Sequence, residues 1–113
     1  MAKVIVVGGG PSGIMAAISA AKQNHSVTLI ERNEFLGKKL KLTGGGRCNI
    51  TNNRDIEEFF SKIVTNNKFL YSALYTFSNY QLLEYLSEKG LEYKVEYDEK
   101  VYTKSDKADE VIS

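Results

Sequence analysis

"KVIVVGGGPSGIMAAISAAKQNHSVTLIE", residues 3–31, is the stretch that decides the fold. It opens with a short β-branched apolar run, which is typical of a buried strand because such side chains pack well on a pleated surface. The alanine-rich segment after the glycines favours a helix, with Asn24 as its C-terminal stop. A second β-branched run, SVTLI, completes the stretch. Strand, helix and strand within roughly 30 residues predict a βαβ unit with two parallel strands.

A G-x-G-x-x-G pattern lies between the first strand and the helix, at Gly8, Gly10 and Gly13. In this context Gly8 permits the tight turn, Gly10 the close approach of a pyrophosphate, and Gly13 the packing of helix on strand. The start of the helix offers unpaired N–H groups to phosphates, and Ser12 adds a hydroxyl donor. Glu31 stands after the second strand, where an acid accepts hydrogen bonds from the hydroxyls of an adenosine ribose. The pattern predicts a dinucleotide site that prefers FAD or NAD to NADP.

A second glycine-rich stretch, LTGGGRCNITN, begins at Leu42. A glycine triplet is costly to order, so it indicates either a slack loop or a place where something approaches the backbone closely. Because this stretch follows the strand that ends before Glu31, we expect it to line the same dinucleotide site from a second side. Nearby side chains are expected to supply positive charge to a pyrophosphate and hydrogen bonds to a flavin: Lys38, Lys39, Lys41 and Arg47, then Asn49 and Thr51.

The rest of the chain divides into three segments. Residues 32–54 are predicted to form mostly an ordered cofactor loop, and residues 55–90 a helical segment whose last helix is capped by Ser78 and ended by Gly90. Residues 91–113 are predicted to form a hairpin and the start of a helix. In LEYKVEY, apolar Leu91, Tyr93, Val95 and Tyr97 alternate with charged residues, which predicts a half-buried strand with the apolar side chains inward. Ser105 is expected to cap the last helix.

Length, composition and charge limit the classes of protein to which this chain can belong. A chain of 113 residues suggests one domain, and no segment approaches the roughly 20 apolar residues of a membrane span. Residues 1–54 carry eight basic and two acidic side chains, a charge of +6, whereas the other residues carry −5. This asymmetry indicates either a solvated basic face or a half that meets an anion. One cysteine and one histidine predict neither a disulfide nor a metal site, and Cys48 is expected to be packed.

The stretch GKKLKLTGGGRCNITN, together with the glycine motif, resembles the bacterial NAD(P)/FAD-dependent oxidoreductases of the bile-acid-reductase-like and aminoacetone-oxidase-like group. The resemblance continues more weakly to the end of the chain and covers about the first quarter of a family protein. Tyr102 and Thr103 depart from it, because members more often have a Phe-Pro pair there. The resemblance implies an α/β, Rossmann-like FAD/NAD(P)-binding domain with a parallel sheet, residues 1–113 being the N-terminal part of a larger flavoprotein.

The same resemblance implies which residues bind FAD. Gly8, Gly10, Ser12 and Gly13 would hold the pyrophosphate, with Pro11 among them, and Glu31 the adenosine ribose. Arg32 would lie beside the adenine. The stretch from pyrophosphate to flavin would be lined by Lys39, Thr43, Gly44, Arg47, Cys48 and Asn49.

The expected function is the FAD-binding portion of a flavin-dependent oxidoreductase, which passes hydride from NAD(P)H through FAD to a small-molecule acceptor. Two alternatives stay open: a fragment without activity, and an NAD-binding module without flavin. The chain offers no candidate catalytic acid or base. We expect a cytoplasmic protein with no membrane or nucleic-acid partner, since its basic residues cluster by a glycine loop rather than along a helix face. Substrate and homo-oligomeric state are not predicted.

Overall fold

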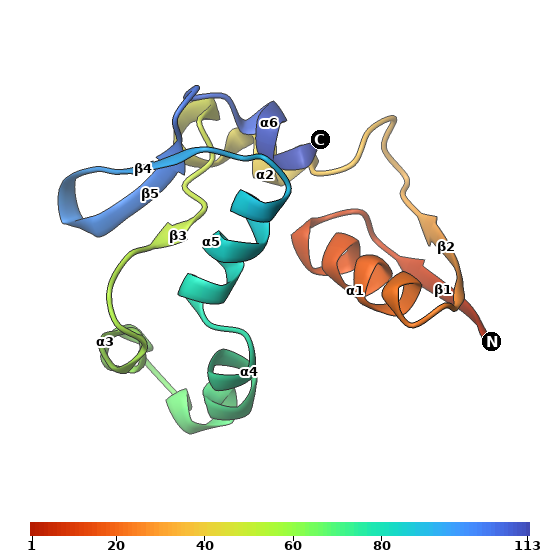
Figure 1. Ribbon diagram of the computed structural model, residues 1–113, viewed down its shortest axis with the longest axis horizontal. Helices are drawn as coiled ribbons and strands as arrows, with labels where there is room; N and C mark the ends of the chain where they lie inside the picture. The colour runs from red at the N-terminus through yellow and green to blue at the C-terminus, as the bar shows by residue number, and fades with distance from the viewer.

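The computed structural model describes all 113 residues and places the predicted βαβ unit at one side of the molecule (Figure 1). The unit consists of β1 (Lys3–Val7), α1 (Pro11–Lys22) and β2 (Ser26–Ile30). The two strands are parallel, with a register that runs from Lys3 opposite Ser26 to Val7 opposite Ile30. The predicted α/β class with a parallel sheet is therefore confirmed.

Helix α1 begins and ends as its sequence predicts. Pro11 occupies the first turn, where its missing N–H costs no intrahelical hydrogen bond. The helix ends at Lys22, and Asn24 adopts a φ of 63°, a left-handed conformation that asparagine tolerates better than most residues. Asn24 is thus the stop that lets the chain turn into β2.

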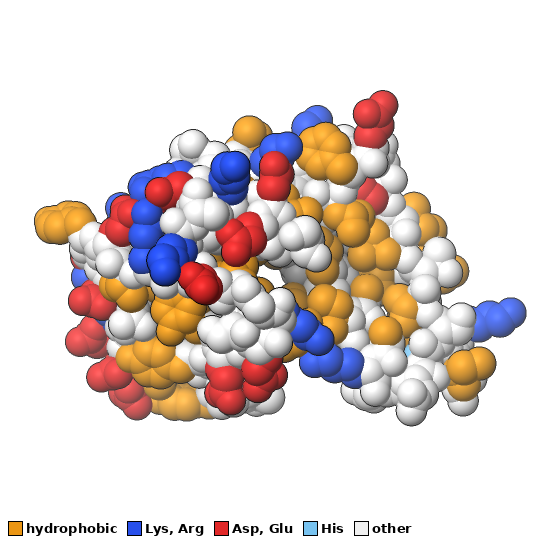
Figure 2. Space-filling view, turned by 45° about the horizontal axis from the view of Figure 1, so that its top comes forward, with side chains coloured by type: hydrophobic (Ala, Val, Ile, Leu, Met, Phe, Trp, Pro, Cys, Tyr) orange, Lys and Arg blue, Asp and Glu red, His pale blue; other side chains and the backbone are white.

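The two-stranded sheet is covered on one face only. The side chains of Val4, Val6, Val27 and Leu29 are half-buried, and α1 packs against both strands. On the other face Ile5 and Val7 are 66% and 81% exposed, and Ile30 is also exposed. The prediction of a buried first strand is therefore wrong for this face, because no element of the chain covers it. In Figure 2, charged side chains concentrate on the part of the molecule away from the βαβ unit, whereas apolar side chains are visible on both parts.

The remaining elements form a second region made of short helices and a small antiparallel sheet. Its strands are β3 (Thr51–Asn52), β4 (Tyr93–Val95) and β5 (Lys100–Thr103), in the order β3-β5-β4. Its helices are α2 (Lys38–Leu42), η1 (Thr43–Gly46), α3 (Ile56–Lys62), η2 (Asn67–Leu70), α4 (Tyr71–Thr76), α5 (Asn79–Glu88), η3 (Tyr97–Glu99) and α6 (Ala108–Ile112). The segment expected to be mostly loop thus contains α2, η1 and β3. None of the helices is long and apolar enough to cross a membrane.

The buried core of this region lies around β5. Val101, Tyr102 and Thr103 are all buried, and the other buried apolar side chains are Cys48, Phe60, Leu83, Leu91 and Ala108. A smaller aromatic group stands apart, where the rings of Phe60 and Tyr71 meet edge to face with centroids 4.5 Å apart. Strand β5 therefore lies between the helical segment and the second glycine-rich stretch.

Two helix starts show when capping can be predicted. Ser78 caps α5 through the backbone N–H of Gln81, and the Gln81 side chain accepts from the Ser78 N–H in return. The predicted cap at Ser105 is wrong, because α6 begins at Ala108. The Ser105 hydroxyl donates to the Glu110 carboxylate instead and lies 3.2 Å from the Thr103 hydroxyl, so residues 104–107 connect β5 to α6 without a first helical turn.

Strand β4 faces the opposite way from the prediction. Tyr93, Val95 and Tyr97 are exposed, whereas Lys94 and Glu96 are half-buried. The strand is also shorter than the alternating stretch that predicts it. The charged side chains turn inward because they find ionic partners there, as described below.

Candidate dinucleotide site

The first glycine loop has the backbone geometry that its motif predicts. Gly8 adopts a φ of +105°, which favours glycine, and its N–H donates to the Ile30 carbonyl at 2.8 Å. A Cβ on Gly13 would lie 1.8 Å from the Gly8 carbonyl oxygen, so only glycine lets α1 pack this close to the loop. A Cβ on Gly10 would meet nothing within 4 Å. The loop is closed on its inner side and open at Gly10.

Three backbone donors at this opening have no partner in the protein. The N–H groups of Gly10, Ser12 and Gly13 donate no hydrogen bond to another residue, and Gly10 offers no capping side chain. No acidic residue stands in the first turn of α1. Unpaired N–H groups and the positive end of the helix dipole together favour an anion at this position.

Glu31 is held against the same loop. Its Oε1 accepts from the Gly9 N–H at 2.8 Å, and its Oε2 accepts from the backbone N–H of Asn33 at 2.7 Å and from the Asn33 side chain at 2.8 Å. These hydrogen bonds, that from the Asn33 backbone first, lower the pKa of Glu31 below its ordinary value. The carboxylate is therefore ionised near neutral pH, and its oxygens keep lone pairs for further donors such as ribose hydroxyls.

The chain after β2 returns along the glycine loop. The Gly37 N–H donates to the Gly9 carbonyl at 2.8 Å, and a Cβ on Gly9 would lie 2.5 Å from the Leu36 side chain. Gly9, Asn33 and Gly37 are functional neighbours that the motif alone does not identify. The available signals were an asparagine two residues after the acid and a glycine before a basic run.

The second glycine loop is ordered rather than slack. Gly44, Gly45 and Gly46 have φ values of 59°, 67° and 92°, a left-handed run that other residues rarely adopt. The Cys48 N–H donates to the Thr43 carbonyl at 2.8 Å and closes the loop. A Cβ on Gly44 would lie 2.8 Å from the Tyr102 ring, whereas Gly45 and Gly46 face open space. Gly44 is thus packed against Tyr102, whereas Gly45 and Gly46 are open to a ligand.

The cations expected near a pyrophosphate fall into two groups. Lys38 and Lys39 form no ion pair, and neither does Arg32, so their charges are free. Lys41 pairs with Asp109 at 3.3 Å, and Arg47 pairs with two carboxylates. The free positive charge beside the glycine loops therefore comes from α2 and Arg32 rather than from Arg47.

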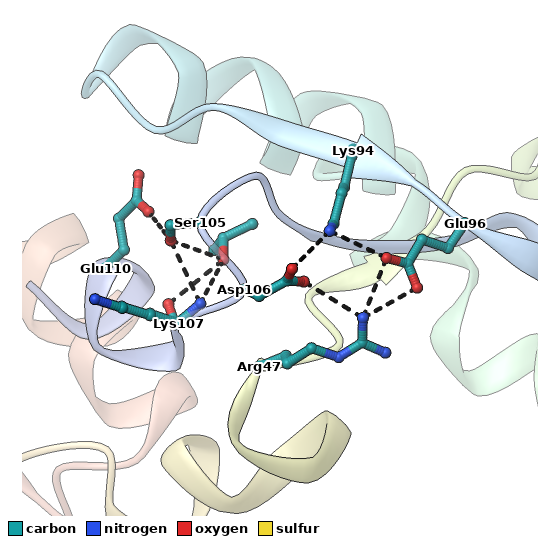
Figure 3. A network of polar contacts seen from close by, with 8 residues as sticks. Arg47, Lys94, Glu96, Ser105, Asp106, Lys107 and Glu110 are labelled. Atoms are coloured by element: carbon teal, nitrogen blue, oxygen red, sulfur yellow. Dashed lines mark hydrogen bonds and ion pairs between the residues drawn. The ribbon is translucent and has the colours of Figure 1, made fainter.

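Arg47 points into a network on the β4–β5 side (Figure 3). Its Nη1 lies 3.1 Å from both carboxylate oxygens of Glu96 and 3.3 Å from Oδ1 of Asp106. Lys94 Nζ bridges the same acids, at 2.8 Å from Asp106 and 3.2 Å from Glu96. The guanidinium also lies 4.0 Å from the centre of the Tyr102 ring. Hydrogen bonds, first from Lys94 and then from Arg47, lower the pKa of Glu96, and those from Lys94 lower the pKa of Asp106.

Cys48 and Asn49 follow the loop with different exposure. The Cys48 side chain is fully buried, and burial raises the pKa of its thiol, with a smaller opposing effect of Thr43. The expected packed thiol is thereby confirmed, and Cys48 presents no side-chain atom to solvent. Asn49 is exposed, and its amide, with nitrogen turned inward, donates to the Thr51 carbonyl at 3.0 Å.

An apolar cleft of about 570 Å³ separates the βαβ unit from the second region. Side chains of α1, Pro11 among them, line most of it with those of α5 and α6, and Leu40, Cys48, Ile50, residues 89–91 and Ser113 line the rest. Of the predicted cofactor residues, only Pro11 and Cys48 border this cleft. A more open depression of about 680 Å³ around Glu92 and Lys104 contains none of them. The open polar groups of both glycine loops therefore lie outside the apolar cleft.

The comparison with protein families decides the identity of this fold. The family described as "HI0933-like protein Rossmann domain" matches residues 2–113. The chain belongs to this family. The resemblance predicted from the two glycine-rich stretches is therefore confirmed, and the βαβ unit is a Rossmann-type unit of the kind that binds dinucleotides.

Curated relatives of this HI0933-like chain include proteins named as a reductase, a synthase and an oxidase. It is 35% identical over 115 residues to a 3-dehydro-bile acid delta(4,6)-reductase of Clostridium scindens, an alignment that covers 99% of this chain and 27% of the relative. It is 32% identical over 89 residues to a ribosomal RNA dihydrouridine synthase of Haemophilus influenzae, covering 79% and 22%. A shorter match, 55% over 40 residues, covers 35% of the chain and 6% of an NADH oxidase of Thermoanaerobacter brockii. The chain thus spans about a quarter of the first two relatives.

Proposed function

We propose that this chain supplies the dinucleotide-binding part of a flavin-dependent oxidoreductase, and that the dinucleotide is FAD. The observation that carries the proposal is the Glu31 carboxylate, fixed by the Gly9 N–H beside a helix start whose donors are unpaired. An acid in this position suits an adenosine ribose with free hydroxyls, and the donors suit a pyrophosphate.

The residues have distinct roles in this proposal. The backbone from Gly10 to Gly13, with Pro11 and the Ser12 hydroxyl, holds the pyrophosphate, while Glu31 accepts from the ribose and Arg32 flanks the adenine. Lys39 adds positive charge. The second loop follows the cofactor toward its flavin: Gly45 and Gly46 are its open members, Thr43 and Asn49 flank them with exposed side chains, and Gly44 and Cys48 contribute backbone only. Bound FAD supplies the redox chemistry; this chain supplies orientation and electrostatics.

Glu31 also supports the choice among dinucleotides. An ionised carboxylate disfavours the 2′-phosphate of NADP through like-charge repulsion. The second glycine loop favours FAD over NAD. Its two open glycines leave room for the part of an extended ligand that lies beyond the adenosine, which in FAD is the ribityl and flavin part. An NAD-binding module without flavin is the second candidate, and it needs the first loop alone.

The reaction is proposed only by class. In the protein that carries this chain, NAD(P)H donates hydride and FAD relays it to a small-molecule acceptor. The relatives' names include a bile-acid reductase and a ribosomal RNA dihydrouridine synthase, so the substrate differs among relatives and is not assigned. A cytoplasmic protein without nucleic-acid or membrane partners completes the proposal.

A titration with FAD, followed by flavin fluorescence, tests the proposal. Wild-type protein is expected to bind FAD, and Glu31→Gln to weaken binding about tenfold, since hydrogen bonds to a charged group contribute about 1.5–3 kcal/mol. Glu34→Gln is the matched control, because Glu34 is exposed and has no ionic partner. Absence of FAD binding, or equal affinities of the two variants, contradicts the proposal. Binding of NAD without FAD supports the module instead.

A further inference from the structure

We propose that Arg47 is a positioning residue that shapes the second glycine loop for cofactor binding, and that it does not contact the cofactor phosphates. This inference rests on the proposed function, because it assigns a role within that site. It differs from the sequence-based expectation, in which Arg47 supplies positive charge to a pyrophosphate.

The direction of the Arg47 side chain is the first observation. Its guanidinium contacts the β4–β5 hairpin, where Glu96 and the Tyr102 ring lie within 3.1 and 4.0 Å. A planar guanidinium suits this site, because one edge meets carboxylates while one face stacks on an aromatic ring. The partners of Arg47 come from a segment about 50 residues away in sequence, so the contact ties the loop to the hairpin.

The charges of the network are the second observation. Arg47 and Lys94 face Glu96 and Asp106, and the four formal charges cancel. A phosphate placed at Arg47 would also meet two carboxylates, which would repel it. Lys38 and Lys39, which form no ion pair, are the better source of positive charge for a phosphate.

The contact between Tyr102 and Gly44 links this network to the glycine triplet. A Cβ on Gly44 would lie 2.8 Å from the Tyr102 ring and 2.9 Å from the Asn49 nitrogen, so Gly44 lies directly against both. The Arg47 guanidinium lies over the same ring, 4.0 Å from its centre. Since glycines have no side chains to hold a loop, the Tyr102 ring that Arg47 contacts holds the backbone of Gly44 in place.

The change in FAD affinity on substituting Glu96 distinguishes a positioning role of Arg47 from direct contact of Arg47 with phosphate. If Arg47 positions the loop, Glu96→Gln loosens the stack and weakens FAD binding by about fivefold, the equivalent of one lost hydrogen bond. If Arg47 contacts phosphate, the same variant removes a repelling carboxylate and frees Arg47, so FAD binds equally well or more tightly.

Arg47→Lys keeps the charge and loses the planar, stacked geometry. Positioning predicts a loss of FAD affinity about as large as that of Glu96→Gln, about fivefold. Arg54→Lys is the matched control, because Arg54 also pairs with the hairpin, at Asp98, but contacts neither glycine loop. Its FAD affinity is expected to equal that of the wild type. Tyr102→Phe keeps the ring and is expected to keep the affinity as well.

Amide hydrogen exchange provides a readout that does not depend on FAD. Faster exchange at Gly44–Gly46 is expected in Arg47→Lys and Glu96→Gln, with wild-type exchange in Arg54→Lys and at Gly8–Gly13 in every variant. Unchanged exchange at Gly44–Gly46, or unchanged or tighter FAD binding in Glu96→Gln, overturns the inference. If wild-type protein binds no FAD, the proposed function fails, and the exchange result alone decides whether Arg47 shapes the loop.

Discussion

The two glycine-rich loops are built in different ways. The loop at Gly8–Gly13 is held by its own neighbours in the βαβ unit: β1 before it, α1 after it, and β2 with Glu31 beside it. The loop at Thr43–Cys48 is held by a hairpin that follows about 50 residues later, through Tyr102 and Glu96. The first loop is therefore a local structure, and the second is a product of tertiary packing.

This difference explains why one loop carries a general motif and the other does not. The first loop needs glycines where the turn, the phosphate and the helix demand them, so its spacing is recognisable in many proteins. The second needs glycines where the chain runs left-handed over an aromatic ring, a demand set by one particular hairpin. Substitutions at the glycines test this comparison most strongly.

Gly13→Ala is expected to have the largest effect. Its Cβ would lie 1.8 Å from the Gly8 carbonyl oxygen, and backbone cannot move away without separating α1 from β1. We expect a loss of more than about 3 kcal/mol in the free energy of unfolding, measured by urea denaturation. Gly10→Ala, with a φ of −79° and open space around its Cβ, should stay within about 0.5 kcal/mol of wild type. Equal losses in the two variants would contradict the packing described for Gly13.

Gly44→Ala is expected to cost less than Gly13→Ala but more than its neighbour. Gly44 and Gly45 have similar positive φ values, so both alanine variants incur about 1 kcal/mol of backbone strain. Only Gly44→Ala also collides with the Tyr102 ring, which adds about 1–2 kcal/mol. The difference between the two urea midpoints therefore measures the tertiary contact. If Gly45→Ala is as destabilising as Gly44→Ala, the hairpin does not hold this loop.

The smallest expected effect is the loss of folding stability at acid pH that comes from the carboxylates beside the second loop. The pKa values of Glu96 and Asp106 lie below their ordinary values in the folded protein, so these groups stabilise the fold above the unfolded-state pKa. That contribution is lost as the pH falls below about 4 and through the folded pKa values. Thermal unfolding of Glu96→Gln is expected to depend less steeply on pH in this range than that of wild type. Parallel curves would show that Glu96 does not stabilise the fold.

How much of the site can be predicted from the sequence also differs between the locally built first loop and the second loop, which depends on tertiary packing. Gly8, Gly13 and Glu31 have the conformations and places expected of them, because the flanking strands and helix determine both. The Ser78 cap was also predictable, since local hydrogen bonds decide it.

The failures lie where contacts that the residue pattern does not reveal, or the absence of a contact, decide the conformation. The inward direction of Lys94 and Glu96 depends on Arg47, and alternation alone predicts the opposite face. Ser105 does not cap α6, because Thr103 and Glu110 bind its hydroxyl. Ile5 and Val7 are apolar as a buried strand requires, yet a face that nothing in this chain covers leaves them exposed.

Hydrogen–deuterium exchange with and without FAD tests most directly whether both loops form one cofactor site. FAD is expected to protect the backbone amides of Gly10, Ser12 and Gly13 and those of Gly44–Asn49 together, while the amides of α3, which lies apart from both loops (Figure 1), keep their exchange rates. Protection of the first loop alone would contradict the account and support a site for an adenosine half only. Protection of neither loop would contradict FAD binding by this chain.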